Sequence, residues 1–515
     1  MFEKDDATVS TPLGSRNSLV DIPKTTVTKL MNNSTKAPEK DKLPTSEKVV
    51  EKGFEEDNWD SDPDNPRNWV TYKKWTAVGI VSFYTLFPPL ASSMMAPGLP
   101  EVAQKYNITN PTILALTLSV FLISFSIGPL FFAPLSELYG RTLTLHVANL
   151  FTLGFSLGCA FAPSTGVFIL FRLLSGFSGS APFGIGGGSV SDVFAERDRA
   201  AGMALYSLGP LLGPALGPVA GGFIAQRLGI RWVFIVIALL CGVASLVGIP
   251  LLKETYAPIV RMRKAKKAGD LELATRLHPA HTSEGRQIGM IWTNVQRPII
   301  LLTHSFICFI LSLYMAFIFG TLFLLFSTFP TIFSDDYGFQ SGVGGLAYLG
   351  LGVGFVCATA FGAKVAALVY SRLSAKNGGI GKPEFRIPAL IFGSFFIPVG
   401  LLWFGWSAKP NIHWIMPIIG SGIFGFGMMT CFLPIQLYLA DSFNYAASAI
   451  ATAATFRSLL GFAFPLFGSQ MFEKLTVGGG CSLMAGLAII LGIPFPIWIY
   501  YNGEAMRARS TLTRK

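Results

Sequence analysis

Residues 209–224 read GPLLGPALGPVAGGFI, an uncharged stretch that is unusually rich in glycine and proline. It lies within an apolar run at about 200–224, which is long enough to cross a membrane as a helix. Glycine lets a neighbouring helix approach closely, and proline removes a backbone hydrogen bond and bends the axis. We therefore expect a kinked helix that packs at an interface between two halves of the protein and acts as a pivot. The residues expected to do this are Gly209, Gly213, Gly217, Pro218, Gly221 and Gly222.

Apolar runs of similar length recur along the chain. Hydrophobic residues make up 51% of the 515 residues and charged residues 13%, whereas soluble proteins carry roughly a quarter charged residues. Because a spanning helix needs about 20 apolar residues, the runs predict an all-α polytopic membrane protein with twelve spans. The runs lie near residues 76–96, 112–134, 144–163, 166–189, 200–224, 231–252, 299–327, 343–369, 387–407, 412–438, 446–470 and 480–501.

The runs divide the chain into two six-helix halves, residues 71–252 and 299–501, joined by a polar central loop at 253–298. The sequence Asp192-Val193-Phe194 ends the fourth run and is echoed by Asp441-Ser442-Phe443 at the end of the tenth. Repeated halves place a substrate site at their interface near the bilayer midplane and rock around it. The sequence therefore predicts transport by alternating access.

Basic residues cluster on one side of the expected membrane. The positive-inside rule places this side in the cytoplasm, together with both termini. The formal net charge is +11, but because the basic residues lie in short clusters between apolar runs, we expect no nucleic-acid partner. The N-terminal tail at 1–70 is polar and expected to be disordered, and a basic tail follows at 502–515. The clusters are Arg141, Arg197 with Arg199, and residues 261–267, 372–386 and 507–515.

The loop after the second run, residues 128–141, reads GPLFFAPLSELYGR and ends in a tight charged turn. It resembles the signature loop of the major facilitator superfamily, with Glu137 in the place of the acid and Gly140 and Arg141 retained. Leu138 stands where that family often has arginine. The resemblance implies that Glu137 lies near the start of the eleventh span and helps to hold an outward-open state. The alternative is that Glu137 and Arg141 only solvate the loop.

Two arginines lie inside apolar runs, where an ionisable group is functional by default. Arg172, followed by Gly176, resembles the Arg-x-x-x-Gly element of the same superfamily, to which proton coupling or substrate contact is attributed. The alternative is that Arg172 reaches the outer interface with its charged end. Arg457 in the eleventh run has no obvious charged partner in the neighbouring runs. We expect it to face the cavity, where it binds an anionic substrate or pairs with a carboxylate from a loop.

The stretch at 213–222 also resembles the antiporter motif of the drug:proton antiporters, which is typical of exporters. Other stretches are similar to the fungal twelve-span branch of that family, and the resemblance covers residues 58–505. It implies the major facilitator fold and export of drugs, polyamines, organic acids or secondary metabolites. These stretches are NPRNW at 65–69, APGLP at 96–100, ETYAP at 254–258 and KPEFR at 382–386.

Acidic residues that could titrate during transport are scarce within the runs, and Glu137, Asp192 and Asp441 remain as candidates for proton coupling. The chain has no Walker A sequence, nucleophile elbow, zinc motif or dinucleotide fingerprint. We therefore expect neither an enzyme nor an ATP-driven pump, and no cofactor or bound metal. A proton gradient is the expected driving force.

Aromatic and methionine side chains are expected to line a cavity that accepts varied ligands. Asn107 lies in the first outer loop, within Asn-Ile-Thr, and is a candidate for glycosylation. The cavity candidates, besides Arg172 and Arg457, are Tyr84, Phe87, Met94, Tyr314, Phe317, Tyr348, Met428 and Phe456.

The function that these features predict is proton-coupled export of small organic compounds by a monomer in the plasma membrane, with the vacuolar membrane as the alternative location. Its expected partners are membrane lipid, the small-molecule substrate and protons. One alternative is uptake or organelle exchange of an organic anion such as a dicarboxylate, or transport of a metabolite within a biosynthetic pathway. A second alternative is a membrane sensor that does not transport and that signals through the N-terminal tail.

Overall fold

The computed structural model describes residues 59–195, 198–277, 296, 299–409, 412–443, 446–510 and 513. Residues 1–58, which make up most of the expected N-terminal tail, lie outside the described residues, as do Arg197 and most of the chain after residue 510. The chain divides into two units, Met1–Trp59 and Asp60–Lys515. All the long apolar helices belong to the second unit.

Residues 59–70 are folded, although we expected them to be part of a disordered tail. They form two short 3₁₀ helices, η1 (Trp59–Ser61) and η2 (Pro66–Asn68). The side chain of Asn65 caps η2 by accepting a hydrogen bond from the backbone N–H of Arg67 at 3.0 Å. Asp62 pairs with Lys264 of the central segment, and this hydrogen bond lowers the pKa of the Asp62 carboxyl. The segment just before the first span is therefore tied to the segment that follows the sixth.

The first half contains six helical stretches that are long and apolar enough to cross a membrane. In lipid, each backbone N–H and C=O needs a partner within the protein, and a continuous helix supplies these partners itself. The elements are α3 (Thr71–Ser93), η3 (Ala96–Gly98), α4 (Leu99–Tyr106), α5 (Pro111–Tyr139), α6 (Arg141–Ala160), α7 (Thr165–Gly179), α8 (Ala181–Val193), α9 (Arg199–Leu228) and α10 (Ile230–Leu251).

The second half contains five such stretches. Its first long helix begins at Phe306, where Ser305 caps it by accepting from the N–H of Cys308 at 3.3 Å. Residues 299–304, at the start of the run expected at 299–327, are also helical, but Ser305 separates them from this long helix. The expected central loop also contains two helices, α11 (Ala257–Lys267) and α12 (Leu271–Leu277). The elements of the second half are α14 (Phe306–Asp335), α15 (Ser341–Leu346), α16 (Leu349–Cys357), the π-helical turn η5 (Ala358–Gly362), α17 (Ala363–Lys376), η6 (Pro383–Arg386), α18 (Ile387–Ser407), α19 (Ile415–Ser442), α20 (Ala446–Gly492) and α21 (Pro494–Arg509).

The last of the eleven candidate spans, Ser448–Arg509, is 62 residues long. A helix of that length rises about 93 Å, roughly three times the thickness of the hydrocarbon core. Thr476 interrupts it with φ 63° and ψ 168°, which are not helical angles. Thr476 thus divides α20 into two helical lengths, residues 446–475 and 477–492, and α21 follows after a turn at Ile493. The twelve-span count stays a prediction, because length and apolarity group all of these helices into one candidate span.

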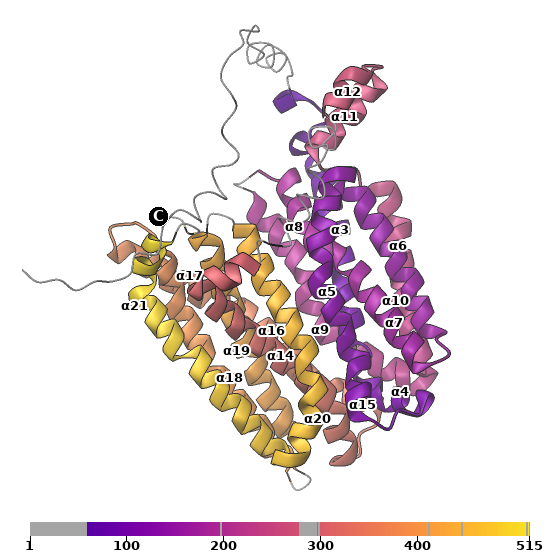
Figure 1. Cartoon of the computed structure of the whole chain (residues 1–515), viewed down its shortest axis with the longest axis vertical. Helices are drawn as coiled ribbons and strands as arrows, with labels where there is room; N and C mark the ends of the chain where they lie inside the picture. The colour runs from indigo at the N-terminus through magenta and orange to yellow at the C-terminus, as the bar shows by residue number, and fades with distance from the viewer. Residues whose placement is uncertain are drawn as a thin grey trace, which may run out of the picture. The chain divides into compact units, whose positions relative to one another are not determined.

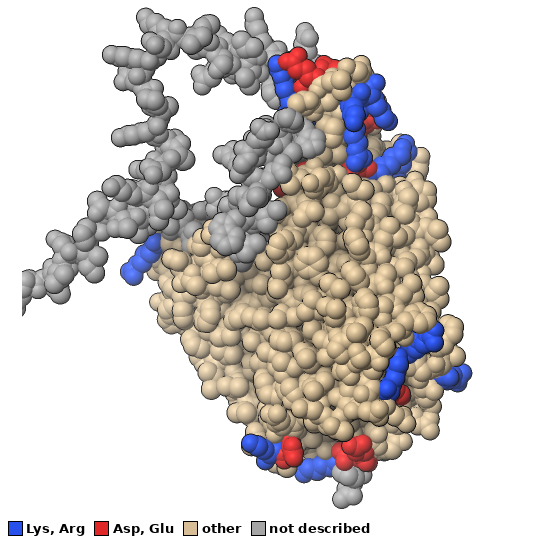
Figure 2. All heavy atoms as spheres, turned by 45° about the vertical axis from the view of Figure 1, so that its right-hand side comes forward, with Lys and Arg blue, Asp and Glu red and all other residues tan. Residues whose placement is uncertain are grey.

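The two halves lie side by side, the first drawn from indigo to magenta and the second from orange to yellow (Figure 1). Side chains of α3 and α14 are largely buried, whereas α10 exposes Leu239, Leu246 and Ile249. Charged side chains gather near the two ends, and an uncharged band lies between them (Figure 2). Such a band is the surface that lipid tails cover. Peripheral helices therefore shield a core made by α3 and α14.

The two halves repeat each other in detail. A Cβ at Gly248 of α10 would lie 2.2 Å from the hydroxyl of Tyr84, and one at Gly492 of α20 would lie 2.3 Å from the hydroxyl of Tyr314. Asp192 and Asp441 close the fourth and tenth spans and lie at the same end of the unit as the end of α21. We call this the inner end, following the orientation that the basic residues predict; that it faces the cytoplasm stays a prediction.

Candidate functional site

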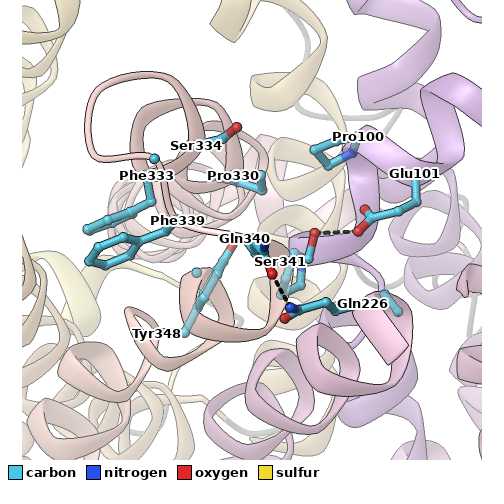
Figure 3. A pocket seen from close by; sticks show the side chains of 14 residues that line it. Pro100, Glu101, Gln226, Pro330, Phe333, Ser334, Phe339, Gln340, Ser341 and Tyr348 are labelled. Atoms are coloured by element: carbon cyan, nitrogen blue, oxygen red, sulfur yellow. Dashed lines mark hydrogen bonds between the residues drawn. The ribbon is translucent and has the colours of Figure 1, made fainter. Parts of the chain in front are cut away.

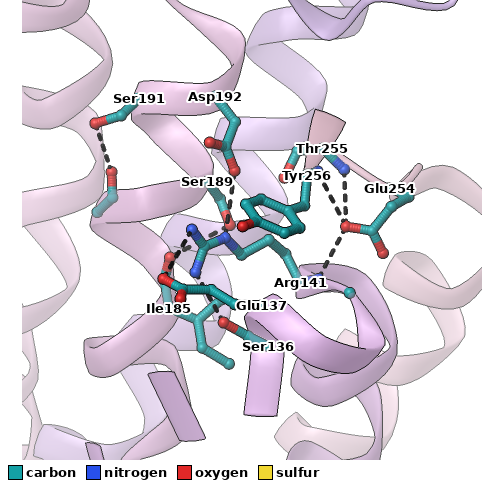
Figure 4. Close-up of polar contacts among 12 residues, drawn as sticks. Ser136, Glu137, Arg141, Ile185, Ser189, Ser191, Asp192, Glu254, Thr255 and Tyr256 are labelled. Atoms are coloured by element: carbon teal, nitrogen blue, oxygen red, sulfur yellow. Dashed lines mark hydrogen bonds and ion pairs between the residues drawn. The ribbon is translucent and has the colours of Figure 1, made fainter. Parts of the chain in front are cut away.

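A cluster of charged residues at the inner end of the first half is built around Arg141, the first residue of α6 (Figure 4). Its Nε donates a hydrogen bond to Oδ2 of Asp192 at 3.3 Å, and its Nη1 donates to the hydroxyl of Ser136 at 2.8 Å. Its guanidinium carbon lies 4.9 Å from the ring centre of Tyr256. Burial raises the pKa of the Tyr256 hydroxyl, which keeps it neutral beside these charges. The cluster joins α5, α6 and α8.

Glu254 closes this cluster from the segment after α10. Its carboxylate accepts hydrogen bonds from the backbone N–H groups of Arg141 at 2.8 Å and Thr142 at 3.3 Å. These groups form the N-terminus of α6, where the helix dipole stabilises a negative charge. Gly140 makes this approach possible, because its φ is 104° and a Cβ there would lie 2.3 Å from Oε2 of Glu254. We call Ser136, Glu137, Arg141, Asp192, Glu254 and Tyr256 the N cluster.

Glu137, the expected gate acid, pairs within its own half. Its Oε1 lies 3.9 Å from Nη2 of Arg141, and its side chain is 47% exposed. The contact with the start of the eleventh span that the family resemblance implies is therefore not made in this conformation by the described residues. Its role in holding an outward-open state stays a prediction.

The second half has a corresponding C cluster, made of Glu384, Arg386, Tyr438, Asp441 and Arg507. Arg386 and Asp441 form an ion pair at 2.7 Å. Glu384 accepts two hydrogen bonds from Arg507, both at 2.8 Å. The sequence reasoning included Asp441 but missed Glu254, Glu384 and the two arginines. The stretches ETYAP and KPEFR were the available signal, because they contain both glutamates.

One group of contacts between the halves lies at the opposite, outer end, beside a cavity (Figure 3). The hydroxyl of Ser341 on α15 donates to Oε1 of Glu101 on α4. The side chain of Gln226 on α9 donates to that of Gln340 and accepts from the backbone N–H of Gly342 at 2.9 Å. We call these contacts the outer seam. They border a cavity of about 390 Å³, whose other lining residues include Phe333, Phe339 and Tyr348.

Farther in, α5 and α20 hold the halves together near mid-membrane. Ser126 donates to the carbonyl of Thr455 at 3.0 Å, and Thr455 donates to the carbonyl of Ser126 at 3.4 Å. At the inner end, by contrast, the ion pairs of the N and C clusters each stay within one half, as far as the described residues show. The halves are thus joined from the outer end to the middle.

The glycines of α9 do not all face the interface that we expected. A Cβ at Gly217 would lie 2.2 Å from Oγ of Ser93 on α3; one at Gly209 or Gly213 would also meet α3, and one at Gly221 would meet Met94, which directly follows α3. All four contacts are within the same half. Among the glycines of this motif, only Gly222 faces the other half, where an added Cβ would lie 2.3 Å from the carbonyl oxygen of Ser341. The expectation that Gly217 packs between the halves was therefore wrong, because four-residue spacing puts these four glycines on one face of the helix.

Arg172 is 1% exposed and lies within the first half. Its Nε, Nη1 and Nη2 donate to the carbonyl oxygens of Thr117, Ala91 and Leu118, at 3.1 to 3.2 Å. The aromatic ring centre of Phe121 lies 5.0 Å from its guanidinium carbon. In this conformation Arg172 ties α7 to α3 and α5. Each of its three nitrogens is hydrogen-bonded within the first half, and its assignment to proton coupling stays a prediction.

Arg457 on α20 is different. Its guanidinium carbon lies 4.8 Å from the ring centre of Phe319 on α14 and 5.8 Å from that of Phe432 on α19. Its Nε is buried and has no hydrogen-bond partner among the described residues. Nor does the described chain supply an ion pair for it.

Seven of the eight aromatic and methionine candidates are at most 4% exposed. They pack inside the protein in this conformation; the hydroxyl of Tyr84, for example, lies 2.8 Å from Nδ1 of His146. Phe456 is partly exposed, and Tyr348 borders the outer cavity. Asn107 is exposed at the outer end, where it ends α4 with φ 51°. The described residues include no group of three or more His, Cys, Asp or Glu placed to hold a metal ion.

Known proteins are similar to this chain in sequence and in fold. The sequence profile of the Major Facilitator Superfamily matches residues 81–465. MFS transporter cpaT of Aspergillus oryzae is 42% identical over 90% of this chain and 94% of its own length. Efflux pump radE of Floropilus chiversii is 39% identical over 88% of this chain and 84% of its own length.

Among solved structures, the xylose transporter XylE from E. coli, in a partially occluded inward-open conformation, has a TM-score of 0.62. It is 12% identical and is matched over 84% of this chain and 98% of its own, which shows the fold alone. The fungal relatives are named as transporters and efflux pumps rather than enzymes. The chain therefore belongs to the major facilitator superfamily, and it is a multi-pass membrane transporter.

Proposed function

We propose that this transporter exports small organic compounds across the plasma membrane in exchange for protons, by alternating access and without ATP. The main support for this proposal is that the two halves are hydrogen-bonded to each other at the outer end and near the middle of the membrane but not, among the described residues, through the charged clusters at the inner end. Hydrogen bonds between them run from the outer seam to Ser126 and Thr455, whereas the ion pairs of the N and C clusters at the inner end each stay within one half in the part of the chain that the structure describes. Such an arrangement is what a transporter needs when it faces the cytoplasm.

Two further observations support export as the direction. The motif on α9 resembles the antiporter motif that is typical of exporters, and it packs closely within the first half: a Cβ at Gly209, Gly213 or Gly217 would lie less than 3.0 Å from an atom of α3. Relatives such as radE are named efflux pumps. Proton coupling rests on the resemblance and on Glu137, Asp192 and Asp441, which lie at the inner end where cytoplasmic protons are exchanged.

The test is uptake into inside-out vesicles that carry the protein, with a panel of drugs, polyamines and dicarboxylates. Proton-coupled export predicts uptake that needs an acidic vesicle interior, collapses with an uncoupler, and is absent from vesicles of cells that lack the protein. ATP alone should give no uptake. Uptake that ignores the proton gradient would overturn the coupling, and uptake seen only in right-side-out vesicles would overturn the direction. A fluorescent fusion then locates the protein in the plasma or the vacuolar membrane.

A further inference from the structure

Arg457 carries a charge about halfway through the membrane. It is the twelfth residue of α20 (Ala446–Gly492), so it lies roughly 17 Å along the helix from its inner end. Buried arginines normally have their five N–H donors occupied, because an unpaired donor in a low-dielectric interior is expensive. In Arg172 each of the three guanidinium nitrogens donates to a carbonyl oxygen. Arg457 is partly exposed, but its Nε is buried, and it has no hydrogen bond or ion pair with any described residue.

The side chain of Arg457 points toward the boundary between the halves rather than toward lipid. Gly461 is four residues farther along α20 and therefore shares its face. A Cβ at Gly461 would lie 3.0 Å from a methyl carbon of Leu122 on α5, in the first half, and 3.0 Å from the ring of Phe319. The face that carries Arg457 thus meets α14 of its own half and α5 of the other.

No acidic residue lies at this depth on the helices that surround Arg457. On α5, α14, α19 and residues 446–475 of α20, each acidic residue lies at or close to an end of its helix. Asp441 is already paired with Arg386. The acidic residues of these four elements are Glu137, Asp335, Asp441 and Glu473. A carboxylate partner for Arg457 in the described chain would have to come from a helix end well away from its position.

We propose that Arg457, which lies beside the adjacent rings of Phe319 and Phe432, is the anion-binding residue of the transport path, and that the transported compounds are aromatic or otherwise apolar organic anions. The guanidinium can donate two parallel hydrogen bonds to a carboxylate or an acidic enolate. The two rings stabilise the cation while the site is unloaded and offer flat apolar surfaces to the body of the substrate. This assignment rests on the export function proposed above and gives it a substrate class.

An anionic substrate also suits the scarcity of carboxylates within the spans. In a cell whose interior is negative, the membrane potential itself drives an anion outward. Export of such a compound therefore needs no titrating acid beside the substrate. Arg457 instead lowers the barrier for the negative charge at mid-membrane, where it would otherwise be most costly.

Binding of three probes that share one ring system tests the proposal: naphthoate, naphthamide and naphthylmethylamine. Dissociation constants are measured with the full chain in lipid nanodiscs. Wild-type protein should bind naphthoate at least about tenfold more tightly than the other two, because only the carboxylate forms charge-assisted hydrogen bonds. Arg457→Gln should weaken naphthoate binding about tenfold or more and leave the other two unchanged, and Arg457→Lys should restore part of the loss.

Arg231→Gln is the matched control. The guanidinium carbon of Arg231 also lies over a ring, 4.1 Å from the centre of Phe161, but Arg231 is at the outer end of α10. The Arg231→Gln substitution should therefore leave naphthoate binding unchanged. If Arg457→Gln fails to fold, as judged by size-exclusion chromatography, Phe319→Leu and Phe432→Leu take its place and should also weaken naphthoate binding. Wild-type protein that does not prefer naphthoate, or Arg457→Gln protein that keeps the preference, would overturn the proposal.

The same variants in inside-out vesicles separate this proposal from the export function. Naphthoate binding that depends on Arg457, without gradient-driven uptake of any compound, would overturn export and leave the anion site standing. Gradient-driven uptake of naphthylmethylamine that is the same in wild-type and Arg457→Gln vesicles would leave export standing and overturn the anion site.

Discussion

The two faces of α9 use the same kind of residue for different contacts. On one face, Gly217 and its three companions at four-residue spacing let the helix lie against α3, which belongs to the same half. On the other, Gly222 meets the carbonyl of Ser341 on α15, and a Cβ at Gly345 would lie 2.6 Å from the carbonyl oxygen of Pro218. The first face joins helices within a half, and the second joins the halves.

The difference shows which contacts have to break during alternating access and which do not. A contact within a half stays formed in every state, so damage to it changes the stability of the protein. A contact between halves forms in one state and breaks in another, so damage to it shifts the balance of states. Arg172 and Arg457 follow the same division: Arg172 is hydrogen-bonded within its half, and Arg457 lies at the boundary without a hydrogen-bond partner among the described residues.

The largest effect is expected from Gly217→Leu, on the face that meets α3. A Cβ there would already lie 2.2 Å from Oγ of Ser93 and 3.0 Å from the carbonyl oxygen of Leu90, and leucine adds three more carbons. Overpacking a close contact costs about 1–3 kcal/mol and sometimes more, and backbone atoms of α3 cannot turn aside. We expect most of the folded protein to be lost, as measured by size-exclusion chromatography of a fluorescent fusion.

Gly154→Leu on α6 is its control, because nothing lies within 4 Å of a Cβ at that position. It should leave the amount of folded protein unchanged. Folded Gly217→Leu protein at wild-type levels would contradict the division drawn between the two faces of α9.

Arg172→Leu should have the second largest effect, again on stability. The substitution removes three hydrogen bonds from a charged donor, each worth about 1.5–3 kcal/mol, and the gain from removing a buried charge offsets part of that loss. We expect the free energy of unfolding to fall by about 2 kcal/mol or more, seen as a lower melting temperature in detergent. Arg457→Leu, which breaks no described hydrogen bond, should leave the melting temperature unchanged or raise it. Equal losses in the two variants would remove the distinction between them.

Much of the fold could be predicted from the sequence, because each span is a long uncharged apolar run. The runs at 112–134 and 387–407 lie inside or coincide with helices of the structure. Boundaries were harder to predict, since apolarity does not show where a helix extends beyond the lipid: α17 continues to Lys376, seven residues past the run expected at 343–369. The folded residues 59–70 were missed because they are polar and owe their order to distant partners such as Lys264.

The site was less predictable, because its members become neighbours only through the fold. Asp192 and Arg141 were both singled out, but the carboxylate of Glu254 that also holds Arg141 lies 113 positions farther along the chain. Apolar periodicity does not show which side of a span meets another helix, so Tyr84 and Met428 were expected in a cavity and are buried. Arg457 was recognised because a charge in an apolar run stands out whatever surrounds it.

Gly345→Ala, on the face that joins the halves, should impair transport and spare folding. Its Cβ would lie 2.6 Å from the carbonyl oxygen of Pro218, so α15 and α9 could no longer close fully. If closure loses about 1.4 kcal/mol, the closed outer seam becomes about tenfold less populated relative to its alternatives. We expect a clear loss of vesicle uptake with an unchanged amount of folded protein.

The neighbouring Gly344→Ala is a close control, because nothing lies within 4 Å of a Cβ at that position. Its uptake should match that of the wild type. Loss of folded Gly345→Ala protein, or equal uptake by the two alanine variants, would show that this face of α9 does not act as a closing contact.

The smallest effect is expected from Ser341→Ala, which removes one polar contact from the same seam. Its hydroxyl donates to Glu101, and without it Oε1 loses that partner while Oε2 is already buried without one. A hydrogen bond to a charged group contributes about 1.5–3 kcal/mol when buried, and less here because the cavity beside Glu101 admits water. We expect uptake to change less than about tenfold and the melting temperature to stay the same.

Ser334→Ala is the control. Ser334 borders the same cavity and its side chain has no hydrogen bond among the described residues, so the substitution should change neither uptake nor the melting temperature. If Ser341→Ala lowered the melting temperature as much as Arg172→Leu does, the outer seam would be a contact that stays formed in every state. The halves would then not open and close at the outer end, and the conclusion that this conformation is open at the inner end would fall.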